Sequence, residues 1–473
     1  MKKLKYILTG MIGTLFFTYS CDMVGPIDDI KPLYKLTEET TFSDVTKTEA
    51  VLSGVYTAWR KGSLNTYTGY THLLSGDYSN VTLLGIYGTD LFENRVNVDD
   101  PNLIGFYSDF YGIIQRANYL INAMQSEIVI PGLTTARRLE IEAEARLQRA
   151  MGHFFLLRNF GQFYDLNSDL GIVIEEVPVR GSADDPRSTV QESYNLILSD
   201  LDFAMANAPA IASVGRLSRH AAKAMKAKVL LYMENWTGAA SLALETINSG
   251  VYKLKPDFRV VYTKGYTSDE VIFSPISIFP NGISYAGSYL FKPGQSLIAL
   301  ADKSVGTSSD GNMVTGAGFD PRFAYAHATS TTPSDVYNNK YPFPQVNGQQ
   351  AGSTFILRLG EMYLIYAEAK ARLAANVDAD ALDKLNNIRN RAGLSDAAPT
   401  TKAELLEMIR LEKKLELFGE FNEPWFDMVR YHVLGNVNIT ALKATITSNN
   451  QLILPYPTLA LSGNGGLVQN PGY

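Results

Sequence analysis

The stretch Leu357–Tyr431 constrains the fold of this chain most strongly, because apolar residues recur there at helical spacing in three successive segments. In the first segment, Leu359, Met362 and Tyr366 follow one another at intervals of three and four residues, which places them on one helix face. Alanines between them are small enough to let a neighbouring helix approach closely. The pattern predicts three packed helices.

The boundaries of these helices are also marked in the sequence. The second helix is expected to start near Asp378 and to stop at Gly393, a residue suited to the left-handed turn after a helix end. Thr401 and Glu404 have the spacing of a capping box and predict the start of the third helix. Paired helices with small residues at their crossing are similar to tetratricopeptide-type hairpins. We therefore predict a mostly α protein with a tetratricopeptide-like helical scaffold, long irregular loops and a few short strands.

Helical periodicity is absent from two long regions of the chain. The scaffold is expected over residues 46–60, 103–250 and 357–431. Two regions lack a helical period. Residues 61–101 are rich in Gly, Asn, Thr, Asp and aromatic residues, and residues 255–355 are rich in Gly, Ser, Pro, Asn and Tyr. We predict long loops there, with short strands such as residues 271–273. Irregular segments of this length often carry function, so we expect these two regions to bind ligand.

The N-terminus has the pattern of a targeting segment. Basic residues (Lys2, Lys3, Lys5) precede the apolar run Tyr6–Tyr19, which is too short for a comfortable membrane span. The only cysteine of the chain, Cys21, follows directly. We interpret residues 1–20 as a lipoprotein signal peptide and Cys21 as the lipidation site. A plain secretory signal with an accidental free cysteine is the alternative.

The rest of the chain is expected to form one arm and one domain. Residues 21–45 are polar and contain two prolines, so we predict an extended arm between a lipid and the domain. Residues 46–473 are expected to form that single domain. If Cys21 is acylated, no thiol remains, which excludes disulfides and cysteine nucleophiles.

The charge of the chain argues against nucleic acid as a partner. The formal net charge is −6 for 473 residues, and removal of the three lysines in residues 1–20 would take it to about −9. Phosphate binding requires a basic surface, so an acidic chain of this kind does not fit. The charge says nothing for or against sugars.

No motif for catalysis, metal binding or nucleotide binding is present. No two of the five histidines lie three or four residues apart, and HExxH is missing, so no metal site is predicted. A calcium ion held by loop oxygens is left open. The chain also lacks a Walker motif and a GxSxG nucleophile elbow, so we predict no cofactor and no catalytic residue.

Four motifs of the C-terminal stretch point to a known family. RLGEMYLIYAEA, LNNIRNRAGL, LEKKLELFGE and WFDMVRY follow in this order. Together they resemble the C-terminal signature of the SusD/RagB family, whose members are surface lipoproteins that capture nutrients, usually glycans. The resemblance implies a SusD-like fold, a lipid anchor in the outer membrane, and a position at the cell surface. It also implies a SusC-like TonB-dependent transporter as the partner.

Three glutamates of the same stretch require a choice between two roles. Glu412, Glu416 and Glu420 lie four residues apart on one helix face, with several arginines nearby in sequence (Arg358, Arg389, Arg391 and Arg430). The glutamates could supply an acid/base pair, as in a glycosidase. They could instead form an ion-pair network with arginine forks between packed helices. We favour the network, because the resemblance places these glutamates in the family's scaffold.

A sugar-binding site is expected to combine aromatic rings, which stack on sugar faces, with a few polar side chains. Trp59, Trp236 and Trp425 all lie in helical segments, so we predict a site built from tyrosines. The candidate ligand-binding residues are Tyr67, Tyr70, Tyr78, Asn80, Tyr87, Asp90 and Asn94 in the first region and Tyr285, Tyr289 and Tyr337 in the second.

The resemblance and the candidate residues together imply a function. We expect a non-enzymatic, cell-surface glycan-binding lipoprotein that delivers oligo- or polysaccharide to a SusC-like TonB-dependent transporter. The scarcity of tryptophan platforms keeps open a peptide ligand, as in the RagB branch of the family. A surface glycosidase is the third alternative.

Overall fold

The computed structural model describes residues 38–473 with short gaps. The gaps are residues 82–83, 180, 182–183, 214, 276, 279–289, 307–309, 314, 330–335, 339, 341–344, 347–348, 353 and 422. The predicted signal peptide, arm and lipidation site at Cys21 therefore lie outside the described residues.

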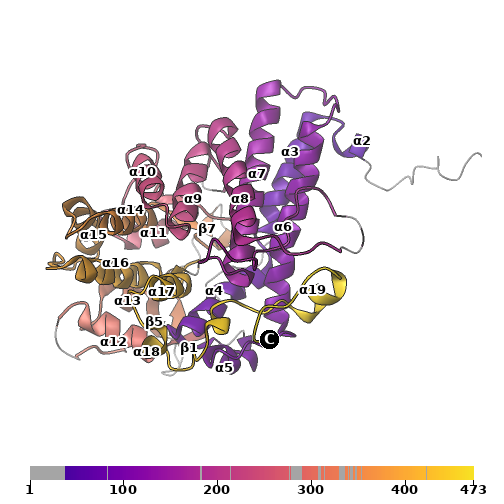
Figure 1. Ribbon diagram of the computed structural model, residues 1–473. Coiled ribbons are helices and arrows are strands. Elements are labelled where there is room, and N and C mark those ends of the chain that lie inside the picture. Colours follow the sequence, from indigo (N-terminus) through magenta and orange to yellow (C-terminus); the bar gives the residue numbers. More distant parts are fainter. Residues whose placement is uncertain are drawn as a thin grey trace, which may run out of the picture.

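Helices dominate the described chain (Figure 1). Those of the N-terminal half are α2 (Glu38–Thr41), α3 (Val45–Ala58), α4 (Gly62–Ser75), α5 (Tyr87–Phe92), α6 (Pro101–Gln125), α7 (Thr135–Phe160), α8 (Val190–Asn207), α9 (Arg219–Tyr232) and α10 (Trp236–Ile247). Those of the C-terminal half are α11 (Arg259–Lys264), η3 (Gly265–Thr267), α12 (Gln295–Lys303), α13 (Pro321–Ala326), α14 (Leu359–Leu373), α15 (Ala379–Arg391), α16 (Lys402–Leu417), α17 (Glu423–Val433), α18 (Ile439–Leu442), η4 (Asn449–Leu452) and α19 (Thr458–Gly463).

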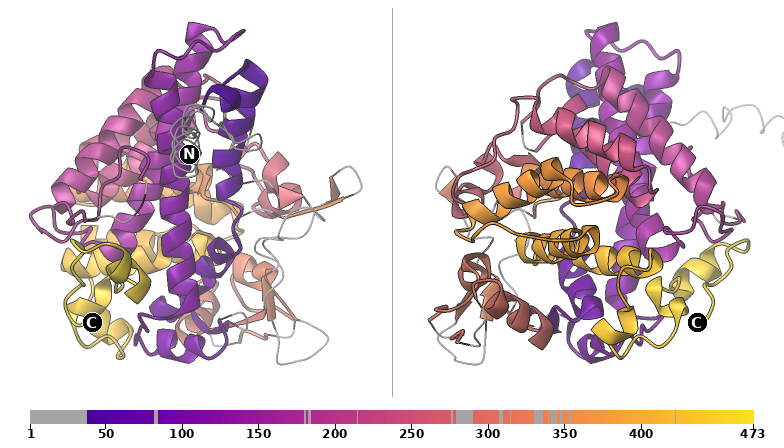
Figure 2. Two further views of the ribbon diagram at one scale, coloured as in Figure 1. Left: turned by 90° about the vertical axis from the view of Figure 1, so that its right-hand side faces the viewer. Right: turned by 60° about the vertical axis from the view of Figure 1, so that its left-hand side comes forward.

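The long helices pack in succession and build the scaffold. Helix α6 lies against α7, α7 against α8, α8 against α9, and α9 against α10, and the series continues through α14, α15 and α16 (Figures 1 and 2). Fully buried alanines such as Ala221, Ala224 and Ala243 line the crossings of α9 and α10. Small side chains let helix axes approach closely, so this packing follows from the sequence. The prediction of a mostly α fold is confirmed.

The C-terminal helices begin and end where the sequence indicates. The side chain of Asp378 caps α15, and Gly393 follows that helix with φ +81°. Thr401 and Glu404 form the predicted capping box at the start of α16. These three sites satisfy backbone groups that the helix ends leave unpaired.

Short antiparallel strands lie beside the scaffold. The first sheet has the order β1 (Tyr78–Val81), β4 (Leu290–Pro293), β6 (Val336–Asn338) and β5 (His327–Thr329). The second pairs β2 (Val271–Phe273) with β9 (Leu357–Arg358), which confirms the strand predicted at residues 271–273. The third has the order β3 (Ser277–Ile278), β8 (Gln349–Gly352) and β7 (Gln345–Val346).

The prediction of long loops over residues 61–101 is wrong. This region contains α4, β1 and α5. Leu64, Tyr67 and Leu74 of α4 are buried, and their spacing of three and seven residues is that of a helix face. Tyrosine supplies much of this face, so the helical pattern is hidden when tyrosines are assigned to binding rather than to packing.

The glutamates of α16 form the predicted ion-pair network. Glu416 accepts hydrogen bonds from Arg358 Nη1 at 2.7 Å and from Arg322 Nη1 at 3.0 Å. Glu420, just beyond the helix, accepts from Arg358 Nη2 at 3.0 Å, and Glu412 pairs with Arg322 and Arg389. All three carboxylates are at most 3% exposed. The interpretation as a network is confirmed, although Arg430 pairs with Glu368 instead.

A half-buried carboxyl lies in the connection between α7 and α8. Glu175 accepts a hydrogen bond from the Gln115 side chain and has no cationic partner among the described residues. Burial raises the pKa of Glu175 from 4.5 to about 7, and the nearby Asp185 raises it further. The folded protein therefore retains this proton at pH values where the unfolded chain has lost it.

This carboxyl should make stability depend on pH. Because the folded pKa is raised, the contribution of Glu175 is fully present below pH 4.5 and is lost as pH rises through about 7. Between pH 4.5 and 7.5, the free energy of unfolding of Glu175→Gln relative to wild type should rise by about 2 kcal/mol. Urea titrations at both pH values measure this shift. Glu176→Gln, at the exposed neighbouring position, is the control, and its free energy of unfolding should change with pH as that of wild type does. The same pH dependence in wild type and Glu175→Gln would contradict the prediction.

Candidate functional site

Three of the predicted ligand-binding tyrosines lie in the core. Tyr67 and Tyr70 are 0% exposed and Tyr78 is 1% exposed. The ring of Tyr67 packs against Phe106, and that of Tyr78 stacks on Phe291 with a centroid distance of 4.3 Å. Rings enclosed in this way offer no face to a ligand. Their assignment to a binding site is therefore wrong, because they complete the apolar faces of α4 and β1.

The other predicted aromatic positions are only partly described. Tyr285 and Tyr289 lie outside the described residues. Tyr337 belongs to β6 and pairs with Leu290 of β4, but its side chain is not described. Tyr87 begins α5 and is half-buried, and Asn80 is exposed on β1. A ligand role for these five residues stays a prediction.

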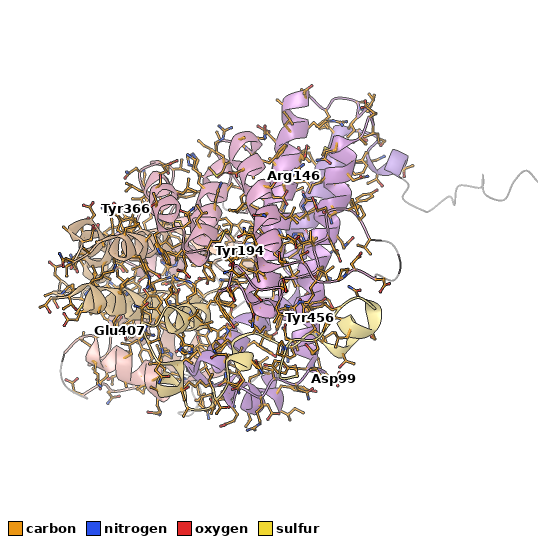
Figure 3. All side chains as sticks on the ribbon, in the orientation of Figure 1. Asp99, Arg146, Tyr194, Tyr366, Glu407 and Tyr456 are labelled. Carbon is orange, nitrogen blue, oxygen red and sulfur yellow. The ribbon has the colours of Figure 1, made fainter. Side chains whose placement is uncertain are left out.

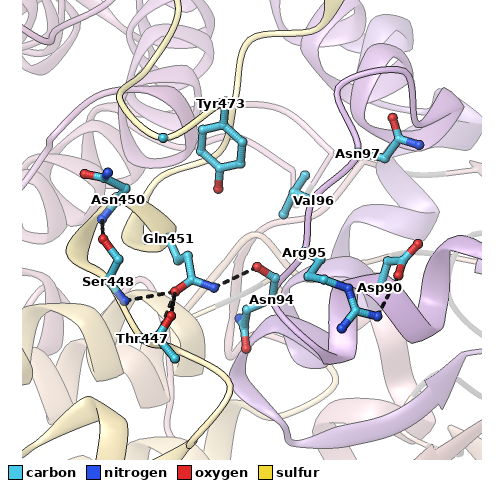
Figure 4. A pocket seen from close by; sticks show the side chains of 11 residues that line it. Asp90, Asn94, Arg95, Val96, Asn97, Thr447, Ser448, Asn450, Gln451 and Tyr473 are labelled. Atoms are coloured by element: carbon cyan, nitrogen blue, oxygen red, sulfur yellow. Dashed lines mark hydrogen bonds and ion pairs between the residues drawn. The ribbon is translucent and has the colours of Figure 1, made fainter.

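Asp90 and Asn94 come together at the rim of a hollow of ≈ 560 Å³ (Figure 4). Its wall is formed by side chains from residues 90–97, by residues 447–451, and by residues 472–473. We call this space the polar hollow. Almost every side chain that lines it carries an amide, a hydroxyl or a charge, and Val96 is the only aliphatic one.

Asn94 fixes the geometry of the polar hollow. It has φ +54°, a left-handed conformation that Asn adopts more readily than most residues. Its Nδ2 donates to the carbonyl of Leu74 at 3.1 Å, and its Oδ1 accepts from Thr445 Oγ1 at 2.6 Å. The Asn94 carbonyl also accepts from Gln451 Nε2 at 3.0 Å. Asn94 thus links the end of α4 to Thr445 and Gln451 of the C-terminal segment. It is only 3% exposed.

The second wall is held by a capping box. Ser448 caps the short helix η4, and Gln451 returns to the backbone of the cap. Gln451 Oε1 accepts from the backbone N–H groups of Thr447 at 2.8 Å and Ser448 at 3.0 Å (Figure 4). Sequence reasoning missed this wall, although the Ser-x-x-Gln pattern was a visible signal for the helix start.

Several groups of the polar hollow remain able to contact a ligand. Asn450 uses its backbone N–H to bond Ser448 Oγ, and its side-chain amide makes no hydrogen bond within the described chain. The side-chain oxygen of Asn97 accepts from the backbone N–H of Asp99, and its amide nitrogen makes no hydrogen bond to any residue that the structure describes. Tyr473 is 38% exposed. Burial raises its pKa to about 12, and its hydroxyl donates to the carbonyl of Ile453 at 3.3 Å, which orients the ring.

Metal binding and membrane spanning were both considered for the described part of the chain. Among them, no group of three or more His, Cys, Asp or Glu side chains could hold a metal ion. No helix in the described part of the chain has both the length and the apolar character needed to cross a bilayer. The polar hollow itself holds a single carboxylate side chain, that of Asp90.

Comparison with known proteins agrees with this architecture. The model of the "SusD family" matches residues 261–473, and the model described as "Starch-binding associating with outer membrane" matches residues 29–231. The chain is 25% identical to a SusD-like protein of Bacteroides ovatus over 394 residues, which cover 71% of this chain and 67% of that protein. The chain belongs to the SusD family.

Solved structures share the fold. A SusD-like protein from Bacteroides fragilis superposes with a TM-score of 0.73 at 20% identity, covering 95% of this chain and 100% of the other. A laminarin binding SusD-like protein superposes with a TM-score of 0.69 at 23% identity, covering 91% of this chain and 100% of the other. At such identities the likeness establishes the fold.

Proposed function

We propose that this protein is a non-enzymatic, glycan-binding lipoprotein of the outer surface. The observation that carries the proposal is the polar hollow, which offers free amides and one partly exposed ring on the scaffold of a family with glycan-binding members. Sugar sites combine these two kinds of group: a flat ring for a sugar face and placed donors and acceptors for hydroxyls. The laminarin-binding relative gives the proposal additional weight.

The lining of the polar hollow argues against glycoside hydrolysis there. A glycosidase generally requires two carboxyl groups on opposite sides of the scissile bond. The polar hollow has one carboxylate side chain, and it is already paired with Arg95. The glutamate row of α16 cannot substitute for the missing group, since it is buried in its ion-pair network.

Anchoring and delivery complete the proposed function. Acylation of Cys21 would hold the protein at the outer membrane, and a SusC-like TonB-dependent transporter would receive the captured glycan. Both steps rest on the family and on the N-terminal pattern. Metabolic labelling of cells with a palmitate analogue tests the anchor: wild type should be labelled and Cys21→Ala should not. Co-purification of a TonB-dependent transporter with the tagged protein tests the partnership.

Two substitutions in the polar hollow should weaken glycan binding. Asn450→Ala removes a free amide and Tyr473→Ala removes the ring, and each should raise Kd about tenfold, equivalent to about 1.4 kcal/mol. Calorimetry with the mature chain (residues 21–473) and a polysaccharide panel that includes laminarin and starch measures the change. Asn449→Ala is the matched control, because Asn449 is exposed beside Asn450 but does not line the polar hollow.

The same titrations separate glycan binding from peptide binding. Heat with oligopeptides and none with any glycan would overturn the proposal and favour the RagB-like alternative. Glycan binding that is equal in wild type and both variants would keep the function but exclude the polar hollow as its site.

A further inference from the structure

We infer that the polar hollow selects uncharged saccharides and rejects glycans that carry uronate, sulfate or phosphate groups. This inference rests on the proposed function and specifies its ligand class. The lining has groups that can hydrogen-bond sugar hydroxyls, but its one cationic side chain is paired with a carboxylate.

The charged side chains of the polar hollow neutralise each other. Asp90 Oδ1 accepts from Arg95 Nη2 at 3.0 Å, and the Arg95 backbone N–H bonds the Asp90 carbonyl at 2.8 Å (Figure 4). Both side chains line the space, and no other charged side chain does. An anionic sugar that paired with Arg95 would lie beside the Asp90 carboxylate. Like charge at a binding site opposes association.

Another cation near the polar hollow is committed elsewhere. Lys443 lies behind Asn94 and donates to the carbonyls of Leu73 at 2.7 Å and Leu74 at 2.9 Å. The chain as a whole carries a formal charge of −6, so its long-range field also repels anions.

The free groups of the lining match hydroxyls. A sugar hydroxyl both donates and accepts, and it needs partners of both kinds. The Asn450 amide supplies a donor and an acceptor side by side, Asn97 supplies donors, and the second oxygen of Asp90 supplies an acceptor. This mixture satisfies a polyhydroxyl ring without an unpaired charged side chain.

The lining also disfavours a peptide. Peptide-binding grooves take apolar side chains into pockets, or add a strand to a sheet edge. Val96 is the only aliphatic side chain of the polar hollow, and its walls are a helix start and irregular segments. A saccharide uses the single ring of Tyr473 and the amides, whereas a peptide would leave most of them unsatisfied.

A charge-reversal experiment tests the selection. The mature chain is run in native gels that contain neutral polysaccharides (laminarin, starch, galactomannan) or anionic ones (polygalacturonate, alginate, carrageenan). Wild type should be retarded by at least one neutral polymer, with less than a twofold change in Kd between 20 and 500 mM NaCl, and by no anionic polymer. Exposed charged sites lose affinity steeply over this salt range, so the salt test separates the two modes.

Asp90→Asn should create anion binding. The substitution removes the carboxylate that faces Arg95, so retardation by polygalacturonate should appear and should disappear at 500 mM NaCl. Asp99→Asn is the matched control, since it removes the same charge from an exposed neighbour outside the polar hollow (Figure 3). It should behave as wild type.

The outcomes distinguish this inference from the proposed function. Salt-sensitive binding of an anionic polymer by wild type would overturn the selection for neutral sugars while glycan binding stands. If wild type binds neutral polymers but Asp90→Asn gains no binding of anionic polymers, the polar hollow does not determine the selectivity and the inference is overturned. Failure to bind any polysaccharide would overturn both.

Discussion

Replacing Glu416 by glutamine should lower the free energy of unfolding by about 3–5 kcal/mol, the usual cost of breaking one side of a buried ion pair. Glu416 faces Arg322, Arg358 and Arg391, and it is 1% exposed. Burial alone would raise its pKa, but these arginines hold it well below its usual range. The substitution removes one of the anions that these arginines share, the others being Glu270, Asp320, Glu412 and Glu420, and it leaves excess positive charge in a dry interior.

Glu407→Gln on the same helix provides the comparison. Within the described part of the chain Glu407, labelled in Figure 3, pairs with Arg410 alone. Its side chain is 42% exposed. Exposed pairs of this kind contribute at most about 1 kcal/mol. Urea denaturation of both variants at pH 7 measures the difference. Similar losses for Glu416→Gln and Glu407→Gln would contradict the role assigned to the buried network.

Replacing Trp59 by alanine should cost a similar 3–5 kcal/mol, because it opens a large cavity in the core. Trp59 is 1% exposed and meets the ring of Phe155 edge-on, with a centroid distance of 5.8 Å. Its indole N–H donates to Gln148 Oε1 at 3.2 Å, so the substitution also leaves a buried acceptor without its donor.

This substitution separates a packing role from a binding role. We expect Trp59→Ala to lower stability while the Kd for glycan, corrected for the folded fraction, stays within twofold of wild type. Trp236→Ala is the control, since Trp236 is only partly buried at the start of α10 and should cost about 1–2 kcal/mol. Loss of glycan affinity in a stable Trp59→Ala protein would show that the ring is a binding platform.

The helical scaffold could be predicted because its signals are local. Thr401 and Glu404 lie three residues apart at one helix start, and Asp378 and Gly393 each act on the helix end beside them, so each signal can be identified from a few neighbouring residues. The placement of Glu412, Glu416 and Glu420 on one face could be predicted for the same reason, because they are four residues apart. Their arginine partners, however, come from as far away as Arg322, and only packing brings them there.

The tyrosines of α4 could not be assigned from their composition. A tyrosine ring packs as well as it binds, and nothing in the sequence tells which side of Tyr67 or Tyr70 the core will cover. The structure decides it by placing α4 against α6 and α17. Tyr67 and Tyr70, which were predicted to bind ligand, are thus part of the interior of the fold.

The sequence by itself indicated the family, the long scaffold helices and the residue types available for binding. The position of the polar hollow was decided only by the tertiary structure, because Asn94 and Gln451 are 357 residues apart and no local pattern links them. Their hydrogen bond exists because the end of α4 and the C-terminal segment pack side by side. Long-range contacts of this kind are set by the sum of core packing, which no single stretch of sequence encodes.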